Sequence, residues 1–528
     1  MIKSSTLIVF IIIFFSSYFS AQTIPVEWQK NHGGSYVDHG ISMQKTPDGG
    51  YILLGQTNSS DRDVTGLHGS NIDLWLVKTN NTGVIQWSKC LGGTGAENAA
   101  AVITTDDGGY LVIADTRSNN GDLTGHFGNI STTDAWIVKL NNVGTIEWQR
   151  NFGGTLEESA ASVVETSQGF LLVGHSFSND ENIPANKGAT DAYAALYSHQ
   201  GTLLWAKNFG GSGYDYASSV VSVSDGFVIA GNSNSENGDL LNAGYHPNGS
   251  GVRYPDFWVY KIDLSGNVMW SKYYGGPTED IGRSIAKTAD GGYVITGKVG
   301  SYGGDITDFK GGPEDFWVLK IDSGGIIQWK KCYGGSGSDY PRQIKQTQDN
   351  GYIVIGDTYS NNGDVVGSHN LSDIWVLKIS GSGTVEWQRP LGGSKIERGY
   401  DIVEADGGGF VALGSTASQH GDGDVLGNPY ITPDLWLVKL NAGLLGTAEN
   451  QQLIQNELFV YPNPGKDFFS VNSKYPVEEV KIYTAEGKLI SALRSVNQPV
   501  SIKQLTTGIY FIHIKSNGRT VVKKLLKE

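Results

Sequence analysis

Carboxylates recur at fixed positions along this 528-residue chain. One stands four residues after the second glycine of each Gly-Gly pair, and another directly precedes an apolar run centred on an aromatic residue. A third, less regular set lies in the loop before that run. The sets are Asp38, Glu97, Glu158, Asp215, Asp280, Asp339 and Glu397; Asp73, Asp134, Asp191, Asp256, Asp315, Asp373 and Asp434; and Asp63, Asp122, Asp239, Asp305, Asp364 and Asp424.

Such carboxylates suit two kinds of chemistry. A facing pair of Asp or Glu side chains is what glycoside hydrolysis requires, so a secreted, endoglucanase-like hydrolase is one candidate. The alternative is structural, because buried carboxylates accept backbone N–H bonds in turns and pair with recurring Lys and Arg side chains. The structural interpretation is favoured, because each set recurs from repeat to repeat and no pair stands out. We therefore predict no catalytic residue.

Calcium is the one cofactor that the loops suggest. The segments 118–122 and 360–364, Ser-Asn-Asn-Gly-Asp, offer oxygen ligands around a glycine turn, with Asp122 and Asp364 as the candidate metal ligands. Calcium takes six to eight oxygens, but the spacing is not that of an EF-hand. The same loops occur without metal, so both interpretations stay open.

The fourth repeat has the longest loop, and it adds Tyr245, His246, Arg253 and Tyr254. Aromatic and hydrogen-bonding side chains on a loop suit the recognition of a sugar or a protein. We predict that these four residues bind ligand, with a tolerated surface insertion as the alternative. The chain contains no HExxH, GxSxG or P-loop motif.

Tryptophan spacing shows which elements position these residues. All 13 tryptophans fall into two series with a period of about 60 residues, a repeat signature. Each repeat holds four strand-like runs, such as 40–47, 50–57, 73–80 and 83–90, and the first two are joined by an Asp-Gly-Gly turn. The runs 73–80 and 83–90 are expected to form a hairpin buried on both faces. The series are Trp75, Trp136, Trp258, Trp317, Trp375 and Trp436, with Tyr193 in the vacant place, and Trp28, Trp87, Trp148, Trp205, Trp270, Trp329 and Trp387.

This pattern predicts an all-β protein whose main domain is a seven-bladed β-propeller with four-stranded blades. Residues 26–31 match an outer strand but precede the first repeat, while the last repeat stops after its third strand. We therefore expect the N-terminal strand to close the last blade and remove a sheet edge. The plan resembles kelch and quinoprotein-type propellers in architecture only, and a solenoid or paired sandwiches are the alternatives.

The two ends differ from the repeats. Residues 1–21 have the pattern of a secretory signal peptide. Residues 22–446 are assigned to the propeller, 447–456 to a linker, and 457–528, with short alternating strands, to a small β-sandwich. Within this last segment stand Tyr461-Pro462-Asn463-Pro464, Gly487-Lys488, Gly508-Ile509-Tyr510 and Lys523-Lys524.

These motifs, in this order, make the C-terminal segment resemble the type A sorting domain of the type IX secretion system of Bacteroidota. The resemblance implies export across the outer membrane, so that the protein is secreted or lies at the cell surface. It also implies contact with the secretion translocon and with a sortase-like protease that can attach the protein to surface lipopolysaccharide.

The distribution of charged residues along the chain limits the classes of partner. Residues 457–528 hold 11 Lys+Arg and 6 Asp+Glu, whereas residues 4–456 hold 27 and 47, a net charge of −20. So acidic a propeller disfavours nucleic acid as a partner. The two cysteines, Cys90 and Cys332, occupy equivalent positions of distant repeats and are expected to be buried thiols. We predict a binding module for a glycan or a surface protein, with a hydrolase or a structural or motility component as alternatives.

Overall fold

The computed structural model describes most of the repeat region and much of the C-terminal segment. It divides into two compact units, residues 1–441 and 442–528, and each is described here by itself. The predicted signal peptide and linker lie outside the described residues. The described ranges are 24–241, 243–246, 252–429, 432–441, 458–461, 466–473, 476–484, 488–494, 499–516 and 519–527.

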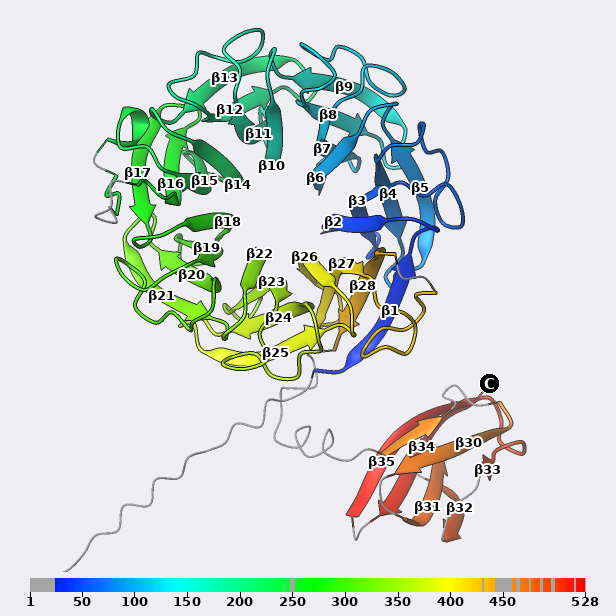
Figure 1. The fold of residues 1–528 in the computed structure, drawn as a ribbon. Helices are drawn as coiled ribbons and strands as arrows, with labels where there is room; N and C mark the ends of the chain where they lie inside the picture. Colours follow the sequence, from blue (N-terminus) through cyan, green and yellow to red (C-terminus); the bar gives the residue numbers. More distant parts are fainter. Residues whose placement is uncertain are drawn as a thin grey trace, which may run out of the picture. The chain divides into compact units, whose positions relative to one another are not determined.

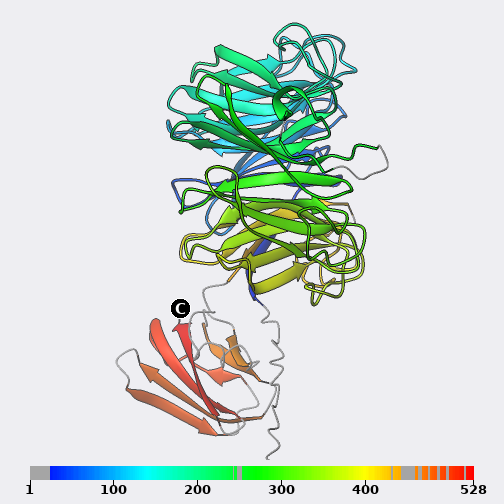
Figure 2. The ribbon, with the colours of Figure 1, turned by 90° about the vertical axis from the view of Figure 1, so that its left-hand side faces the viewer.

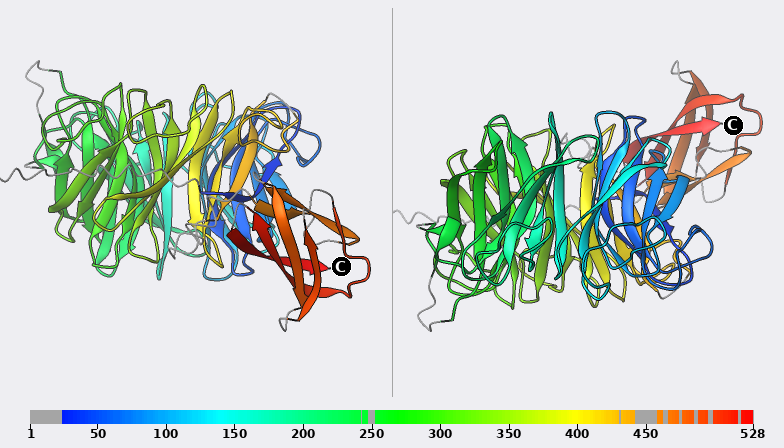
Figure 3. Two further views of the ribbon diagram at one scale, coloured as in Figure 1. Left: turned by 90° about the horizontal axis from the view of Figure 1, so that it is seen from below. Right: turned by 90° about the horizontal axis from the view of Figure 1, so that it is seen from above.

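The first unit is a β-propeller. Its described residues form seven four-stranded antiparallel sheets arranged in a ring around a central axis (Figure 1). Seen from the side, the ring is a disc with loops on its two faces (Figures 2 and 3). Each sheet corresponds to one of the predicted repeats, with the strands of each sheet following one another outward from the axis.

The strand bounds are as follows, from the axis outward. The innermost strands are β2 (Asp38–Lys45), β6 (Glu97–Thr104), β10 (Glu158–Thr166), β14 (Asp215–Val223), β18 (Asp280–Lys287), β22 (Asp339–Gln346) and β26 (Glu397–Glu404). The second strands are β3 (Tyr51–Thr57), β7 (Tyr110–Thr116), β11 (Gly169–Ser176), β15 (Gly226–Ser233), β19 (Tyr293–Val299), β23 (Tyr352–Thr358) and β27 (Phe410–Thr416). The third strands are β4 (Asp73–Thr79), β8 (Asp134–Leu140), β12 (Asp191–Tyr197), β16 (Asp256–Asp263), β20 (Asp315–Ile321), β24 (Asp373–Ile379) and β28 (Asp434–Leu440). The outer strands are β5 (Ile85–Leu91), β9 (Ile146–Phe152), β13 (Leu203–Phe209), β17 (Val268–Tyr274), β21 (Ile327–Tyr333), β25 (Val385–Leu391) and β1 (Val26–His32), and a single 3₁₀ turn, η1 (Gly238–Leu240), lies in the long loop.

The N-terminal strand closes the ring, as the offset of the repeats predicts. β1 pairs antiparallel with β28, so that Asn31 lies opposite Trp436 and His32 opposite Leu435. Because β28 precedes the second unit, the last sheet is built from both ends of the repeat region. Closure leaves β28 with a partner on each side and removes the exposed edge that an open array would present.

The third strands carry the core of each sheet. Every residue of β4 is buried, and Trp75 and its equivalents are fully buried. The outer strands are only half-buried, so the expectation of a hairpin buried on both faces is wrong for its second strand. Their tryptophans pack against the next sheet instead. A Cβ atom added to Gly83, whose φ is +74°, would lie 2.8 Å from the ring of Trp28.

Both cysteines are buried, as predicted. Cys90 lies in β5 and Cys332 in β21, and both are free cysteines. Burial raises the pKa of the Cys90 thiol to about 12, so it stays protonated at neutral pH. Reactivity requires the thiolate, which this environment suppresses.

The second unit contains two small sheets that share one apolar core. Phe469 and Val500 from one sheet join Val480, Ile482 and Ile512 from the other in this core. The predicted small β-sandwich is consistent with this arrangement. The strands are β29 (Leu458–Tyr461), β30 (Phe468–Ser473) and β33 (Val500–Ser501), and β32 (Leu489–Arg494), β31 (Val477–Thr484), β34 (Gly508–Ser516) and β35 (Arg519–Lys527). No helix in the described part of the chain has the length and apolar character needed to cross a bilayer.

We expect Trp375→Ala to lower the free energy of unfolding by about 3–5 kcal/mol, the usual cost of removing a buried tryptophan side chain. Trp375 has no exposed surface, its Nε1 donates to Gln388 Oε1 at 2.9 Å, and its ring packs on Phe316. Denaturant unfolding followed by circular dichroism measures the change. Tyr302→Ala is the control, because 66% of Tyr302 is exposed. Equal stability of the two variants would contradict the assigned core.

Candidate functional site

The first set of recurring carboxylates caps the turns that join neighbouring sheets. Glu97 Oε2 accepts the N–H of Gly93 at 3.2 Å, while its Oε1 accepts the Thr116 hydroxyl at 2.9 Å. The bond to the second glycine of the Gly-Gly pair is present in all seven repeats. These carboxylates therefore have the structural role that the sequence favours.

The third set serves the same turns, whereas the second set accepts N–H bonds from the loop that precedes its own strand. Asp122, one of the calcium candidates, accepts the N–H of Gly92 at 3.3 Å, and Asp73 accepts the N–H of His68 at 2.8 Å. Gly92 lies between them, and an added Cβ would stand 2.4 Å from Glu97 Oε2. Only glycine allows the turn to approach the carboxylates so closely.

The second calcium candidate has an equivalent position. Asp364 accepts the N–H of Gly334 at 3.3 Å, and its carboxylate lies 3.8 Å from Lys310 Nζ. Within the described residues, no three His, Cys, Asp or Glu side chains are grouped so that they could hold a metal ion. Calcium binding by Asp122 and Asp364 stays a prediction.

The recurring lysines of the third strands do not pair with these carboxylates, whereas Arg389, another of the recurring cations, forms an ion pair with Asp424. That part of the structural expectation therefore holds only in part. Lys78 reaches the other end of its sheet, where its Nζ lies 2.8 Å from Asp48 Oδ2 and 2.9 Å from Gln86 Oε1. Lys139 contacts Asp107 in the same way. The reason is the direction of the third strand, which begins at the carboxylate and ends at the lysine. The cations therefore lie beside the Asp-Gly-Gly hairpin turns.

The predicted ligand-binding loop divides into a braced part and an exposed part. Tyr245 Oη donates to the carbonyl of Tyr254 at 2.9 Å, and His246 Nδ1 lies 3.0 Å from Asp256 Oδ2. The hydrogen bond to Asp256 raises the pKa of His246. Arg253 and Tyr254 are exposed, and Arg253 Nη2 lies 3.0 Å from Glu236 Oε2. A ligand role for these residues stays a prediction.

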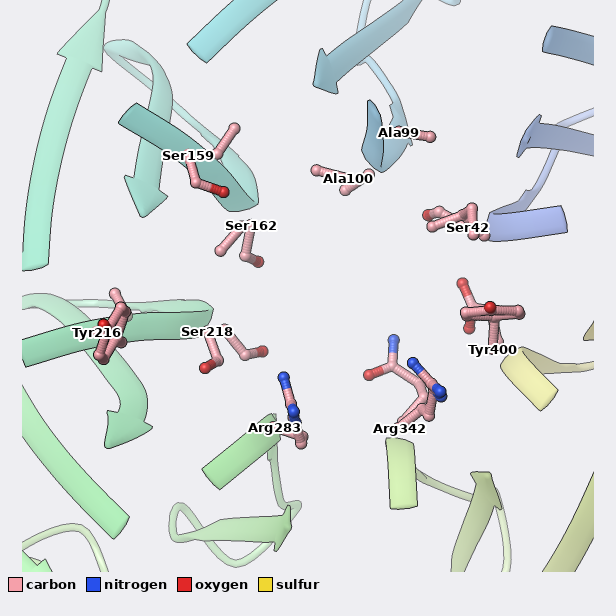
Figure 4. Close-up of a pocket in the computed structure, with 18 of the residues that line it drawn as sticks. Ser42, Ala99, Ala100, Ser159, Ser162, Tyr216, Ser218, Arg283, Arg342 and Tyr400 are labelled. Atoms are coloured by element: carbon pink, nitrogen blue, oxygen red, sulfur yellow. The ribbon is translucent and has the colours of Figure 1, made fainter. Parts of the chain in front are cut away.

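A cavity of about 530 Å³ lies on the axis of the ring, between the innermost strands. Each strand presents the third residue after its capping carboxylate to this channel. In four sheets that residue is small or aliphatic, and in three it is large and polar. The residues are Ile41, Ala100, Ala161, Ser218, Arg283, Arg342 and Tyr400. The lining is therefore asymmetric although the sheets repeat (Figure 4).

Two arginines dominate one side of the channel. Arg342 Nη2 lies 3.0 Å from Asp357 Oδ2, and its Cζ atom is 4.7 Å from the centre of the Tyr400 ring. Arg283 projects from the neighbouring strand into the same space (Figure 4). Among the described residues, Arg283 has neither an ion pair nor a hydrogen-bonded partner. Burial lowers the pKa of Arg283, and the charge of Arg342 lowers it further.

Asp115, His175 and Tyr216 also line the channel. Asp115 accepts the Ala160 N–H at 2.7 Å and the Ser159 hydroxyl at 3.0 Å, which ties β7 to the next sheet. Burial raises the pKa of Asp115 to about 7 and lowers that of His175 to about 4. His175 packs edge-on against Tyr216. Both rings and the carboxyl therefore present a polar, weakly charged wall.

Sequence reasoning missed the channel residues. The predicted ligand-binding residues lie in a loop, whereas the repeat is broken at one position of the innermost strand. The signal was present, because aligning the segments that begin at Asp280, Asp339 and Glu397 with the other four places Arg283, Arg342 and Tyr400 against small or aliphatic residues.

The described sorting-signal residues lie in the strands of the second unit. Tyr510 Oη donates to the carbonyl of Thr506 at 2.8 Å. Tyr461 ends β29, Lys488 immediately precedes β32, Gly508 begins β34, and Lys523 and Lys524 lie in β35. Pro462, Asn463, Pro464 and Gly487 lie outside the described residues.

Residues 459–528 match the family described as the secretion system C-terminal sorting domain. The chain therefore carries a type IX sorting domain, which indicates export and a secreted or cell-surface location.

The chain also has a more distant relative. The chain is 23% identical over 385 residues to the regulatory protein FlaEY of Caulobacter vibrioides, an alignment that covers 66% of this chain and 39% of that protein. The chain thus spans about two fifths of the length of the curated relative it matches.

Similar solved structures include a europium-containing methanol dehydrogenase (TM-score 0.37, 11% identity, 79% of this chain and 93% of that one). A second is Sqt1 from Chaetomium thermophilum (TM-score 0.39, 11% identity, 79% of this chain and 100% of that one). A third is the Pan2 WD40 domain of Neurospora crassa (TM-score 0.32, 9% identity, 63% of this chain and 93% of that one). The propeller fold itself follows from the ring of sheets.

The buried carboxylates of the first and second sets make stability depend on pH. Burial raises the pKa of Asp73 to about 6, of Asp315 to about 7 and of Asp280 to about 8. A carboxyl whose pKa is raised by folding stabilises the fold most below its unfolded pKa, and that contribution is lost as the pH rises through the folded value. The hydrogen bond from Lys78 instead lowers the pKa of Asp48 to about 2, so that contribution is lost only in acid.

We therefore expect the melting temperature to rise as the pH falls from about 8 to about 5, and to drop again in stronger acid. Differential scanning calorimetry across this range measures the effect. Asp280→Asn, which cannot ionise, should flatten the rise, whereas the control Asp48→Asn should leave its slope unchanged. A melting temperature that falls steadily between pH 8 and pH 5 would show that burial does not govern these carboxylates.

Proposed function

We propose that the exported propeller is a binding module that receives its ligand in the axial channel. The observation that carries this proposal is the asymmetric lining, where the repeat is broken by Arg283, Arg342 and Tyr400. A repeated scaffold needs no such break for its own stability. The cavity, about 530 Å³, lies within the range of small-molecule sites, roughly 300–1,000 Å³.

The ligand class that fits best is a glycan, with a segment of a surface protein as the second possibility. The lining residues are largely hydroxyl, amide and charged side chains, including Ser218, Asn232 and Gln343. Such groups recognise polar ligands, and an apolar ligand would leave them without partners. Exposed Tyr254 and Arg253 remain the predicted outer contacts.

A hydrolase finds less support. Its two carboxylates would have to be free to face the substrate. Most of the recurring carboxylates are hydrogen-bonded in turns or loops, and the channel carboxylates are engaged as well. Asp115 accepts the Ala160 N–H at 2.7 Å, and Asp401 Oδ1 lies 2.7 Å from Lys345 Nζ. A structural or motility component would make no use of the channel.

Export is part of the same proposal. The sorting domain would be read by the type IX translocon and then by a sortase-like protease, which can attach the propeller to surface lipopolysaccharide. The support is the family match over residues 459–528.

Affinity electrophoresis tests the binding role. The purified chain is run through native gels that contain neutral or acidic polysaccharides, with calcium or with chelator, and the gels are stained for protein and for polymer. We expect retardation by at least one polysaccharide without loss of polymer. Cleared polymer along the track would establish an enzyme, and unchanged mobility in every gel would exclude the tested glycans.

Removal of residues 459–528 tests the export role. We expect the truncated protein to accumulate inside the cell that produces it, since the translocon would have no domain to recognise. Immunoblots of medium, surface and cell fractions measure its location. A control truncation that removes only Glu528 should not change the location. Truncated protein in the medium at the normal level would contradict the assignment.

A further inference from the structure

The channel leaves one positive charge without a counter-ion. The channel has two arginines, and Arg342 has a counter-ion, because its Nη2 atom lies 3.0 Å from Asp357 Oδ2. Asp357 in turn accepts the Gly399 N–H at 2.8 Å. The ring of Tyr400 covers the Arg342 guanidinium on another side. Arg342 is therefore fixed and largely neutralised.

Arg283 has no such partner among the described residues. Glu279 acts on Arg283 electrostatically, but its Oε2 atom lies 2.7 Å from Lys298 Nζ, so its charge is already compensated. Lys298 also contacts Glu314 at 3.4 Å. Arg283 lines the channel and is exposed to it. A guanidinium fork therefore faces the cavity with all its hydrogen-bond donors available.

The shape and charge of this corner select the ligand. A guanidinium presents parallel N–H groups that match a carboxylate or a phosphate in a bidentate pair. Arg283 and Arg342 point into the same space, and Ser218 lies beside Arg283 (Figure 4). The surrounding hydroxyl and amide groups suit a hydroxyl-rich molecule, and the net charge of −20 on residues 4–456 disfavours a long polyanion.

We infer that the channel binds an acidic saccharide, with its carboxylate on Arg283 and its hydroxyl groups on the polar side chains of the wall. This inference rests on the proposed binding role and specifies its ligand. Arg342 and Tyr400 act as a preorganised wall beside the carboxylate, because their mutual contact fixes both side chains before ligand arrives.

Isothermal titration of the full chain with D-galacturonate, D-galactose and inorganic phosphate tests the inference. We expect galacturonate to bind at least about tenfold more tightly than galactose, the usual worth of one charge-assisted pair. Arg283→Gln should abolish this preference, and Arg283→Lys should restore part of it. Arg117→Gln, which changes an arginine outside the channel, is the matched control and should bind as the wild type does.

Melting temperatures separate binding from folding. Arg283 has no described ion pair to lose, so Arg283→Gln should melt at or above the wild-type temperature. Equal binding of galacturonate and galactose, or galacturonate binding unchanged in Arg283→Gln, would overturn the inference. Phosphate binding without galacturonate binding would also overturn it. Retardation of Arg283→Gln by a polysaccharide gel would leave the broader binding role standing while the acidic-sugar assignment fails.

Discussion

The structure depends on the hydrogen bond between a buried carboxylate and the N–H of a glycine four residues before it. Each Gly-Gly turn leaves the outer strand of one sheet, and the capping carboxylate begins the innermost strand of the next. The same carboxylate accepts a hydroxyl from the second strand of that next sheet, as Glu97 does from Thr116. A buried carboxylate without such donors would be costly, so the turn, the glycines and the carboxylate are required together.

This requirement explains why the fold could be predicted from the sequence in such detail. The spacing of Trp75 and Trp87 fixes a hairpin, the Gly-Gly turn fixes where one sheet gives way to the next, and the early Trp28 shows where the ring closes. Each signal recurs, so errors at one repeat are corrected at another. What could not be predicted was the partner of each charge. Lys78 and Asp73 belong to one strand, but strand direction sends them to opposite ends of the sheet.

The candidate site was harder to predict for the opposite reason. A repeat conceals residues that differ at a single position, and long loops attract attention because they are conspicuous. Tyr245 and His246 are conspicuous in sequence. In the structure, however, Tyr245 donates a hydrogen bond to Tyr254 and His246 contacts Asp256, so both side chains stabilise their own loop. Arg283 is unremarkable in sequence, and its meaning appears only when the ring brings the innermost strands around one axis.

The carboxylate turns and the variable lining of the channel are connected through the stability of the ring. Because the carboxylate turns and the buried third strands hold the ring, the innermost strand is free to vary on the side that faces the channel. Arg283 occupies one of these variable positions, although burial and the charge of Arg342 both lower the pKa of its guanidinium group. An anion in the channel would supply the missing hydrogen bonds and offset both effects. The proposed ligand would therefore give this charge a partner that the described residues of the fold do not provide.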